Sequence, residues 1–197
     1  MGGSGCYNRI QKGITEMEAM FANNRGSEVK ALLKLCEPFD MYSDLDIWNL
    51  FNEISDTFAG VVQYHDAGRI EGACQKIMSE SSDLVGVSKF LLSEFKERNS
   101  KCNNISYKLT MDTLSDTRYS NSSMRQWIFQ TCNEYGYYQT SGSTSQPFGT
   151  KFPLTFYMTL CADLYGHQFS KSFIEARAAE TNEYFGGLTP KVENVYF

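Results

Sequence analysis

The sequence predicts a mainly α-helical protein that is cross-linked by disulfides. First, apolar residues recur at helical spacing along most of the chain, and strands are suggested only around Ile105–Leu109 and at Asn194–Phe197. Second, six cysteines are spread roughly 30 residues apart, with no CxxC pair. Third, 42% of the 197 residues are hydrophobic and 14% are aromatic, which provides for a packed core and excludes a disordered chain.

Five helices are predicted in the first half of the chain. Apolar spacing places them at residues 8–23, from Val29 to Cys36, from an N-cap at Asp44 to Phe58, at 67–79 and at 83–97. Asn23–Gly26 ends the first helix and Pro38 ends the second.

The second half begins with a polar connection over residues 99–123, in which Ile105–Leu109 is predicted as a short strand. Helices are then predicted from Met124 to Tyr138, from Leu154 to Leu164 and from Ser170 to Glu180, with a loop at Ser141–Ser145. The last residues, Asn194–Phe197, look like the start of a buried strand. Such a strand needs neighbours, so its sheet is expected to lie elsewhere.

The cysteine pattern argues against a metal site, because zinc ligands are clustered and the chain has only two histidines. Three long-range disulfides fit the even, dispersed set better; six buried free thiols in a cytosolic protein are the alternative. Two sequons, at Asn104 and Asn121, favour an extracytoplasmic protein, and both lie in the polar connection, where glycans would be accessible. The first five residues, however, show no secretory signal.

Composition also restricts the partners. The net charge is −5 with scattered Lys and Arg, which argues against a nucleic-acid partner. No apolar run approaches the roughly 18 residues that span a bilayer. Walker, dinucleotide-binding and EF-hand motifs are absent from the sequence, so no cofactor is expected.

A search for a catalytic triad finds no suitable residues. The near match to a Gly-x-Ser-x-Gly elbow, Gly2–Cys6, lacks the final glycine and is interpreted as a linker. His65 and His167 are predicted at helix ends in structural roles. The carboxylate pairs Asp44/Asp46 and Glu94/Glu97 are predicted on helix surfaces or as caps.

The most unusual stretch is residues 125–140, with one Trp, one Phe, three Tyr, a Cys and a Glu. Such a density of aromatic rings suits either a core helix or the wall of a pocket, and the residues alone favour the core helix.

This stretch also carries a resemblance. Trp127, Gln130, Thr131, Cys132 and Glu134 resemble the W-x-x-Q-x-C-x-E segment of the serine peptidase family that includes lysosomal Pro-Xaa carboxypeptidase, dipeptidyl peptidase II and thymus-specific serine protease. Further segments agree in the same order: Leu35–Pro38, Phe58–Tyr64, Thr181–Gly187 and Asn194–Phe197. The Gly-Tyr-Tyr sequence at residues 136–138 looks closest to the thymus-specific branch.

The resemblance implies a disulfide-linked helical cap domain over residues 1–122, followed by an incomplete piece of an α/β-hydrolase domain over 123–197. In this family the serine precedes the cap, and the Asp and His follow the strand that Val195–Phe197 resembles. The chain is therefore expected to be a fragment of a serine-type exopeptidase that cleaves small peptides near proline, with no catalytic residue of its own. The alternatives are a non-catalytic, disulfide-linked helical binding protein and a helical bundle that binds a small molecule.

The resemblance also implies roles for single residues. It implies disulfides Cys6–Cys74, Cys36–Cys102 and Cys132–Cys161, whereas Thr140 occupies the position of a further family cysteine. It places Tyr137 at a proline-accepting pocket, with Trp127, Glu134 and Gln130 as further pocket candidates. For Glu134 and Gln130, a structural role in which they satisfy buried polar groups is the preferred interpretation. Ile128 replaces the acidic residue that anchors the substrate amine in dipeptidyl peptidase II, which argues against that specificity.

The resemblance further implies a secreted or lysosomal parent protein and a peptide substrate, and a second copy of the chain is a candidate partner. If the sheet is missing, residues 124–197 should expose apolar surface.

Overall fold

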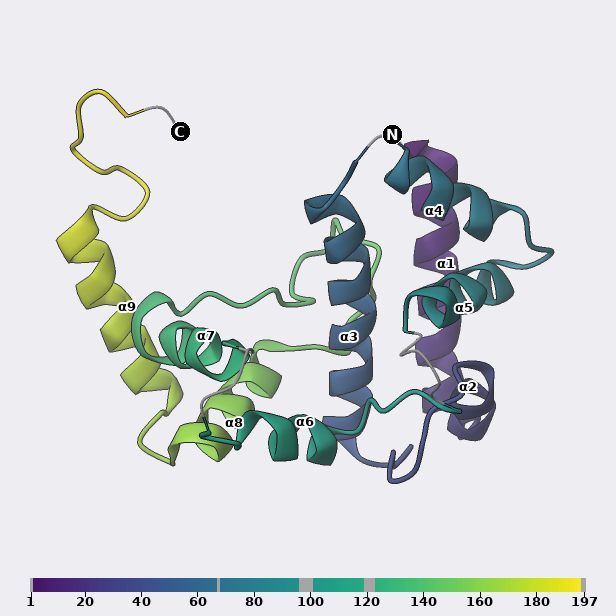
Figure 1. The fold of residues 1–197 in the computed structure, drawn as a ribbon, viewed down its shortest axis with the longest axis horizontal. Coiled ribbons are helices and arrows are strands. Elements are labelled where there is room, and N and C mark those ends of the chain that lie inside the picture. Colours follow the sequence, from purple (N-terminus) through teal and green to yellow (C-terminus); the bar gives the residue numbers. More distant parts are fainter. Residues whose placement is uncertain (1, 67, 96–100, 119–122, 196–197) are drawn as a thin grey trace. The chain divides into compact units, whose positions relative to one another are not determined.

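The computed structural model describes residues 2–66, 68–95, 101–118 and 123–195. The prediction of a mainly helical fold is confirmed, and no β-strand occurs among these residues (Figure 1). The chain forms two compact units. Unit 1 comprises Met1–Thr110 and Thr140–Pro153, and unit 2 comprises Met111–Gln139 and Leu154–Phe197. Each unit thus contains segments that are far apart in the sequence.

Among the described residues, unit 1 contains five helices and the start of a sixth. They are α1 (Gly3–Ala22), α2 (Gly26–Leu32), α3 (Asp44–Gln63), α4 (Arg69–Met78), α5 (Asp83–Glu94) and α6 (Tyr107–Leu114), which continues into unit 2. Two of the five complete helices begin at serine caps: Ser43 Oγ accepts from Asp46 N, and Ser82 Oγ accepts from Val85 N. The predicted N-cap at Asp44 is therefore wrong by one residue, because Ser43 is the extended residue that precedes the helix.

The start of α1 and the end of α2 also differ from the prediction. Helix α1 begins at Gly3, so the presumed linker Gly2–Cys6 supplies its first turn, which the Cys6–Cys74 disulfide joins to α4. Helix α2 ends at Leu32, before Cys36, because Lys34 adopts a positive φ and the chain turns there. These irregular turns depend on tertiary contacts rather than on apolar spacing.

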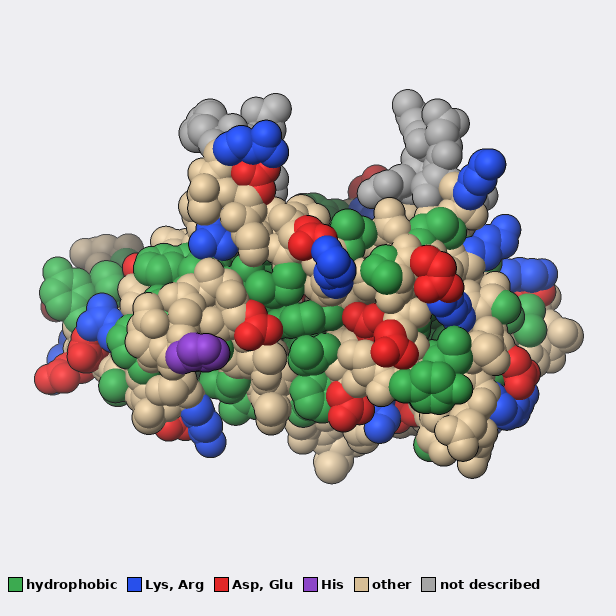
Figure 2. Space-filling view, turned by 90° about the horizontal axis from the view of Figure 1, so that it is seen from below, with side chains coloured by type: hydrophobic (Ala, Val, Ile, Leu, Met, Phe, Trp, Pro, Cys, Tyr) green, Lys and Arg blue, Asp and Glu red, His purple; other side chains and the backbone are tan. Residues whose placement is uncertain are grey.

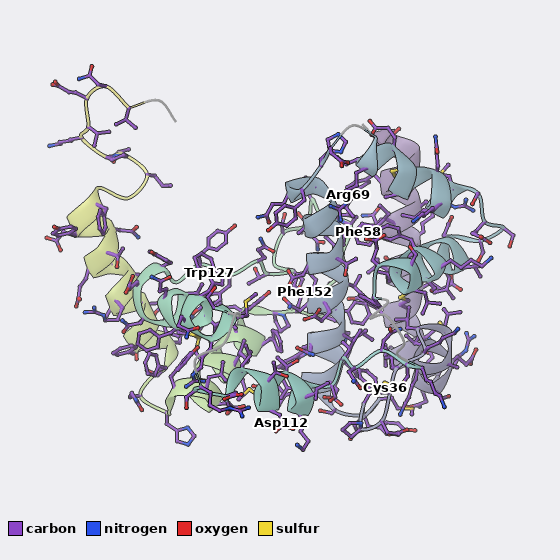
Figure 3. The ribbon with its side chains drawn as sticks, viewed as in Figure 1. Cys36, Phe58, Arg69, Asp112, Trp127 and Phe152 are labelled. Carbon is purple, nitrogen blue, oxygen red and sulfur yellow. A yellow bond between two sulfur atoms is a disulfide. The ribbon has the colours of Figure 1, made fainter. Side chains whose placement is uncertain are left out.

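A dense apolar core holds unit 1 together. It is formed by fully buried side chains from several helices, among them Ile14, Leu50, Ile54, Ile77 and Phe90. The segment Thr140–Pro153 completes this core, because Phe152 is buried in it and the ring of Phe148 packs on Phe58 at a centroid distance of 5.4 Å (Figure 3).

The contact between α1 and α5 is unusually close. A Cβ added to Gly13 would lie 2.8 Å from both the carbonyl oxygen of Asp83 and a methyl group of Val87. One turn earlier, Arg9 donates from Nε to the Asp83 carboxylate at 2.7 Å and from its terminal nitrogens to the carbonyls of Ile77, Met78 and Glu80. The guanidinium therefore satisfies carbonyls at the C-terminal end of α4 that no helical turn could reach.

The predicted strand at Ile105–Leu109 is wrong. Only Asn103 forms an isolated parallel bridge, with Leu35, and α6 begins at Tyr107. The buried carboxylate of Asp46 explains this start, because Oδ1 accepts from Tyr107 N at 2.7 Å while Oδ2 accepts from Asp40 N. The expectation that both Asp44 and Asp46 lie on a solvated surface is also wrong for Asp46, which is 6% exposed.

Unit 2 contains the end of α6, helix α7 (Met124–Gln130), the π-helical segment η1 (Thr131–Tyr135), α8 (Leu154–Tyr165) and α9 (Lys171–Phe185). Its small core combines the Cys132–Cys161 disulfide with Phe169 and Ile174. The predicted helices at 154–164 and 170–180 are present, and α9 runs five residues further, to a glycine cap at Gly186 with φ 87°.

The last described residues do not form the predicted strand. Asn194 and Val195 lie outside any strand, and the Val195 side chain is 56% exposed. Tyr196 and Phe197 lie outside the described residues, as do residues 96–97 of the predicted fifth helix and Asn121 of the second sequon.

Candidate functional site

The candidate site is built on the junction between α7 and η1. Residues 124–138 were predicted as one helix, but the α-helical pattern stops at Gln130 and a π-helical turn follows. Gly136 N donates to Thr131 O at 2.9 Å to close this turn, and Gly136 then adopts a left-handed conformation with φ 56°. Glycine suits this position for two reasons. It adopts a positive φ without a steric penalty, and it avoids a Cβ that would approach Ala178 of α9 to 3.0 Å. The chain leaves the helix here, which separates Tyr137 from the residues of α7. Such π-helical turns occur frequently at functional sites.

A disulfide fixes η1 to α8. Cys132 and Cys161 are almost completely buried, and the half-buried ring of Tyr138 lies next to them. The Tyr138 hydroxyl donates to Thr131 O at 3.1 Å and lies 3.3 Å from Cys161 Sγ. Burial raises the pKa of Tyr138 to about 12, an effect that the hydrogen bond to Thr131 partly opposes. Tyr138 is therefore a neutral, structural tyrosine.

The start of α7 is held by a second polar and aromatic cluster. Arg125 donates to Leu114 O at 2.7 Å and to Leu164 O at 3.4 Å, and its guanidinium lies 4.9 Å from the ring centroid of Tyr165. The Tyr165 hydroxyl in turn donates to Arg125 O at 2.6 Å, and Phe129 packs edge-on against the Tyr165 ring. The backbone beneath the candidate residues is thus fixed from several sides.

Two of the four predicted pocket residues are exposed. Trp127 (Figure 3) is 49% exposed and Tyr137 is 61% exposed, so the interpretation of this stretch as a core helix does not hold for these two residues. The Trp127 ring packs at 6.1 Å on Tyr135, which was not selected from the sequence as a pocket residue. From the sequence, Tyr135 could have been predicted only through the high density of aromatic residues in this stretch, because its contact with Trp127 depends on the π-helical turn.

Gln130 and Glu134 lie on the same segment and are partly buried. Within the part of the chain that the structure describes, neither side chain forms a hydrogen bond, so neither satisfies a buried polar group there. Their amide and carboxylate groups therefore remain available for a ligand.

The two histidines do not form a catalytic centre. His65 Nδ1 accepts from Ile70 N at 3.3 Å and so caps the start of α4, whereas His167 is exposed in the turn after α8. Neither hydrogen-bonds to a serine or a carboxylate within the described ranges. Those ranges also contain no group of His, Cys, Asp and Glu side chains that could hold a metal ion.

Other surface properties add little. No helix in the described part of the chain is long and apolar enough to cross a membrane. On the face drawn in Figure 2, Lys and Arg are interspersed with Asp and Glu, and hydrophobic side chains lie between them.

The fold and the site together define a disulfide-linked helical protein with exposed aromatic side chains on its α7–η1 segment. The model of the family described as serine carboxypeptidase S28 matches residues 1–197, and the chain belongs to this family.

Relatives agree with this assignment. The chain is similar to the thymus-specific serine protease of Mus musculus, with 28% identity over 98% of this chain and 40% of the mouse protein. It is 31% identical to the thymus-specific serine protease of Homo sapiens over 60% of this chain and 23% of that protein. Two proteins of Caenorhabditis elegans are each 25% identical over 92% of this chain. The chain thus spans about two fifths of the length of the mouse relative. No solved structure matches the chain significantly.

Proposed function

We propose that this chain is the helical cap, with an adjoining piece of the hydrolase domain, of a serine-type exopeptidase that cleaves small peptides near proline. The nucleophile, the base and the catalytic aspartate would lie in other parts of the protein. The family match over the whole chain, combined with coverage of only two fifths of the mouse relative, carries this proposal.

The surface of unit 2 supports it. Apolar side chains that a complete domain would cover are exposed on α9 and beyond it, including Tyr184 at 83%, Phe185 at 69% and Leu188 at 101%. Soluble domains seldom leave such residues next to one another in water. We infer that further sequence of the parent protein covers them.

In the proposed enzyme, the α7–η1 segment contributes to the substrate pocket. The exposed rings of Trp127 and Tyr137 would contact apolar side chains or proline rings of the peptide. Gln130 and Glu134, whose side chains form no hydrogen bond with the described residues, would bind polar atoms of the peptide backbone. Ile128 leaves no carboxylate next to Trp127 for a free amine, which favours a carboxypeptidase over an aminodipeptidase.

We further propose a secreted or lysosomal location. All six cysteines form disulfides: Cys6–Cys74, Cys36–Cys102 and Cys132–Cys161, the pairings that the resemblance implies. Disulfides of this kind persist in oxidising compartments. The exposed Asn104 is a candidate glycosylation site of the same protein.

The test compares this chain with the protein encoded by the complete transcript. A fluorophosphonate probe should label a serine of the complete protein and should not label the purified 197-residue chain. Peptides with proline before the last residue should be cleaved by the complete protein alone. Hydrolysis by the sequence-verified 197-residue chain would refute the assignment of catalysis to the other segments. A complete protein without activity would instead favour a helical binding protein.

The pocket assignment has its own test in the complete protein. Tyr137→Ala should raise KM for proline peptides, because the ring would contact bound substrate. Tyr42→Ala is the matched control, since Tyr42 is 77% exposed in a unit 1 turn, away from α7 in sequence. Equal KM values for the two variants would exclude Tyr137 from the pocket.

A further inference from the structure

The sequon at Asn104 combines an exposed acceptor with an inaccessible hydroxyl. The Asn104 side chain is exposed and forms no hydrogen bond within the described ranges. Ser106, the second recognised residue of the Asn-x-Ser motif, is only 3% exposed. Ile105, between them, is 7% exposed and belongs to the core of unit 1. In the folded protein, therefore, only half of the motif is accessible to an enzyme.

The Ser106 hydroxyl also has a structural role. Its Oγ accepts from Leu109 N at 3.2 Å, and its carbonyl accepts from Thr110 N at 3.1 Å, so Ser106 caps the first turn of α6. The following amide, Tyr107 N, donates to the buried Asp46 carboxylate. Presenting the hydroxyl to an enzyme would break the start of α6 and expose the Asp46 carboxylate.

The residue before Asn104 is fixed as firmly. Asn103 N donates to Lys34 O at 2.7 Å, Asn103 O accepts from Cys36 N at 2.9 Å, and Asn103 Nδ2 donates to Leu33 O at 2.6 Å. The Cys36–Cys102 disulfide lies directly beside this bridge, and the segment before α6 runs towards α2 in Figure 1. The disulfide and the backbone bonds together hold the sequon against the α2–α3 turn.

We propose that Asn104 carries an N-linked glycan that is added only before residues 101–107 fold, and that closure of the Cys36–Cys102 disulfide ends the period in which it can be added. The proposal rests on the proposed passage of the protein through an oxidising secretory compartment. It replaces the simpler expectation that an accessible loop displays this sequon.

The two competing reactions are balanced as follows. In glycosylation, the Asn104 amide nitrogen forms a bond to C1 of an oligosaccharide held by a lipid pyrophosphate carrier. The C1–oxygen bond to the pyrophosphate breaks, the amide nitrogen loses one proton, and the lipid pyrophosphate leaves. In disulfide formation, the thiols of Cys36 and Cys102 lose two protons and two electrons to a disulfide oxidant, which is reduced to a dithiol.

The first experiment uses purified oligosaccharyltransferase with a lipid-linked oligosaccharide donor. The acceptor is the full chain in an Asn121→Gln background, so that Asn104 is the only sequon. The folded, oxidised chain should acquire no glycan at Asn104, whereas the reduced, alkylated and denatured chain should be glycosylated there. Asn104→Gln is the negative control in both states. Equal modification of the folded and the denatured chain would overturn the proposal.

Cysteine variants separate the local disulfide from general stability. Cys36→Ser/Cys102→Ser should permit modification of Asn104 under native conditions. Cys132→Ser/Cys161→Ser, which removes the disulfide of unit 2, should keep Asn104 protected. If both variants are modified at the same rate, the role assigned to Cys36–Cys102 is wrong.

The second experiment follows nascent chains in secretory cells by pulse-chase labelling, thiol alkylation and mass spectrometry. Glycan should be added to Asn104 only while Cys36 and Cys102 are still thiols, so the earliest glycosylated chains should carry both free thiols. Chains that acquire glycan after the disulfide closes would overturn the proposal. Chains that form disulfides but never carry glycan would also overturn it, while leaving the proposed compartment intact. Chains with neither feature would refute the compartment itself.

Discussion

Replacing Gly13 by alanine tests the closest helix contact of unit 1. In an exposed helix interior the change would stabilise the protein by about 1 kcal/mol, because alanine has the higher helix propensity. At Gly13 the new methyl group would lie 2.8 Å from the Asp83 carbonyl oxygen and from a Val87 methyl group. A backbone carbonyl cannot rotate away, and overpacking of this kind costs about 1–3 kcal/mol. We therefore expect a net loss of up to about 2 kcal/mol after the gain in propensity.

Gly72→Ala is the matched control. Gly72 also lies inside a helix, α4, but a Cβ there would have no neighbour within 4 Å. This variant should be stabilised by about 0.5–1 kcal/mol, so that the same chemical change has opposite signs at the two positions.

The assay exploits the two tryptophans, since Trp48 lies in unit 1 and Trp127 in unit 2. In a Trp127→Phe background, urea unfolding followed by fluorescence reports unit 1 through Trp48 alone. The midpoint should fall for Gly13→Ala and rise for Gly72→Ala at an unchanged m-value. If Gly13→Ala is stabilised as much as Gly72→Ala, the close approach of α1 to the start of α5 is wrong.

Three further predictions concern the same unit. Cys36→Ser/Cys102→Ser removes a disulfide whose cysteines have a sequence separation of 66. In the chain-entropy model this should lower the free energy of unfolding by about 4 kcal/mol, and a loss under about 1 kcal/mol in urea unfolding would contradict the prediction. Arg9→Lys should lower the free energy of unfolding by about 2 kcal/mol in the same assay, because an ammonium group cannot reproduce the planar guanidinium that binds Asp83 and three carbonyls. An unchanged urea midpoint would show that these guanidinium contacts are dispensable. Burial, with a smaller effect of a neighbouring carboxylate, raises the pKa of Glu53 to about 7, so stability present near pH 4 should decrease as the pH rises towards 7. Burial also raises the pKa of the neighbouring Asp56, so Glu53→Gln should reduce this decrease without abolishing it; a variant with the same pH profile as wild type would refute the assignment.

The helical segments of this protein could be predicted well from its sequence, because helix formation in them follows local apolar spacing. Residues such as Ile14, Leu50 and Ile54 recur at that spacing and are fully buried. The pairing of the cysteines could not be obtained from spacing, and it was implied only by the family resemblance. Composition likewise provided for a core but not for the contribution of Phe152, which reaches it from a segment far along the chain.

The candidate site was predicted less completely. The motif residues Trp127 and Glu134 were identified, but a regular helix was expected where the structure has a π-helical turn that ends at Gly136. That turn determines the contact between Trp127 and Tyr135. No local pattern distinguishes an α-helical from a π-helical turn here, because the choice depends on the disulfide to α8 and on packing against α9.

The sequence by itself therefore determined most of the helices, the even cysteine set, the family and the sequon at Asn104, because each depends on residues that are close along the chain or on a recognisable motif. Only the tertiary structure decided that Ser106 is buried as the cap of α6, that Asp46 is a buried acceptor rather than a surface carboxylate, and that Tyr137 lies exposed after a π-helical turn. The physical reason is the same in each case. Burial and hydrogen bonding are set by partners distant in sequence, such as Asp46 and Tyr107 with a sequence separation of 61, and no local spacing encodes them.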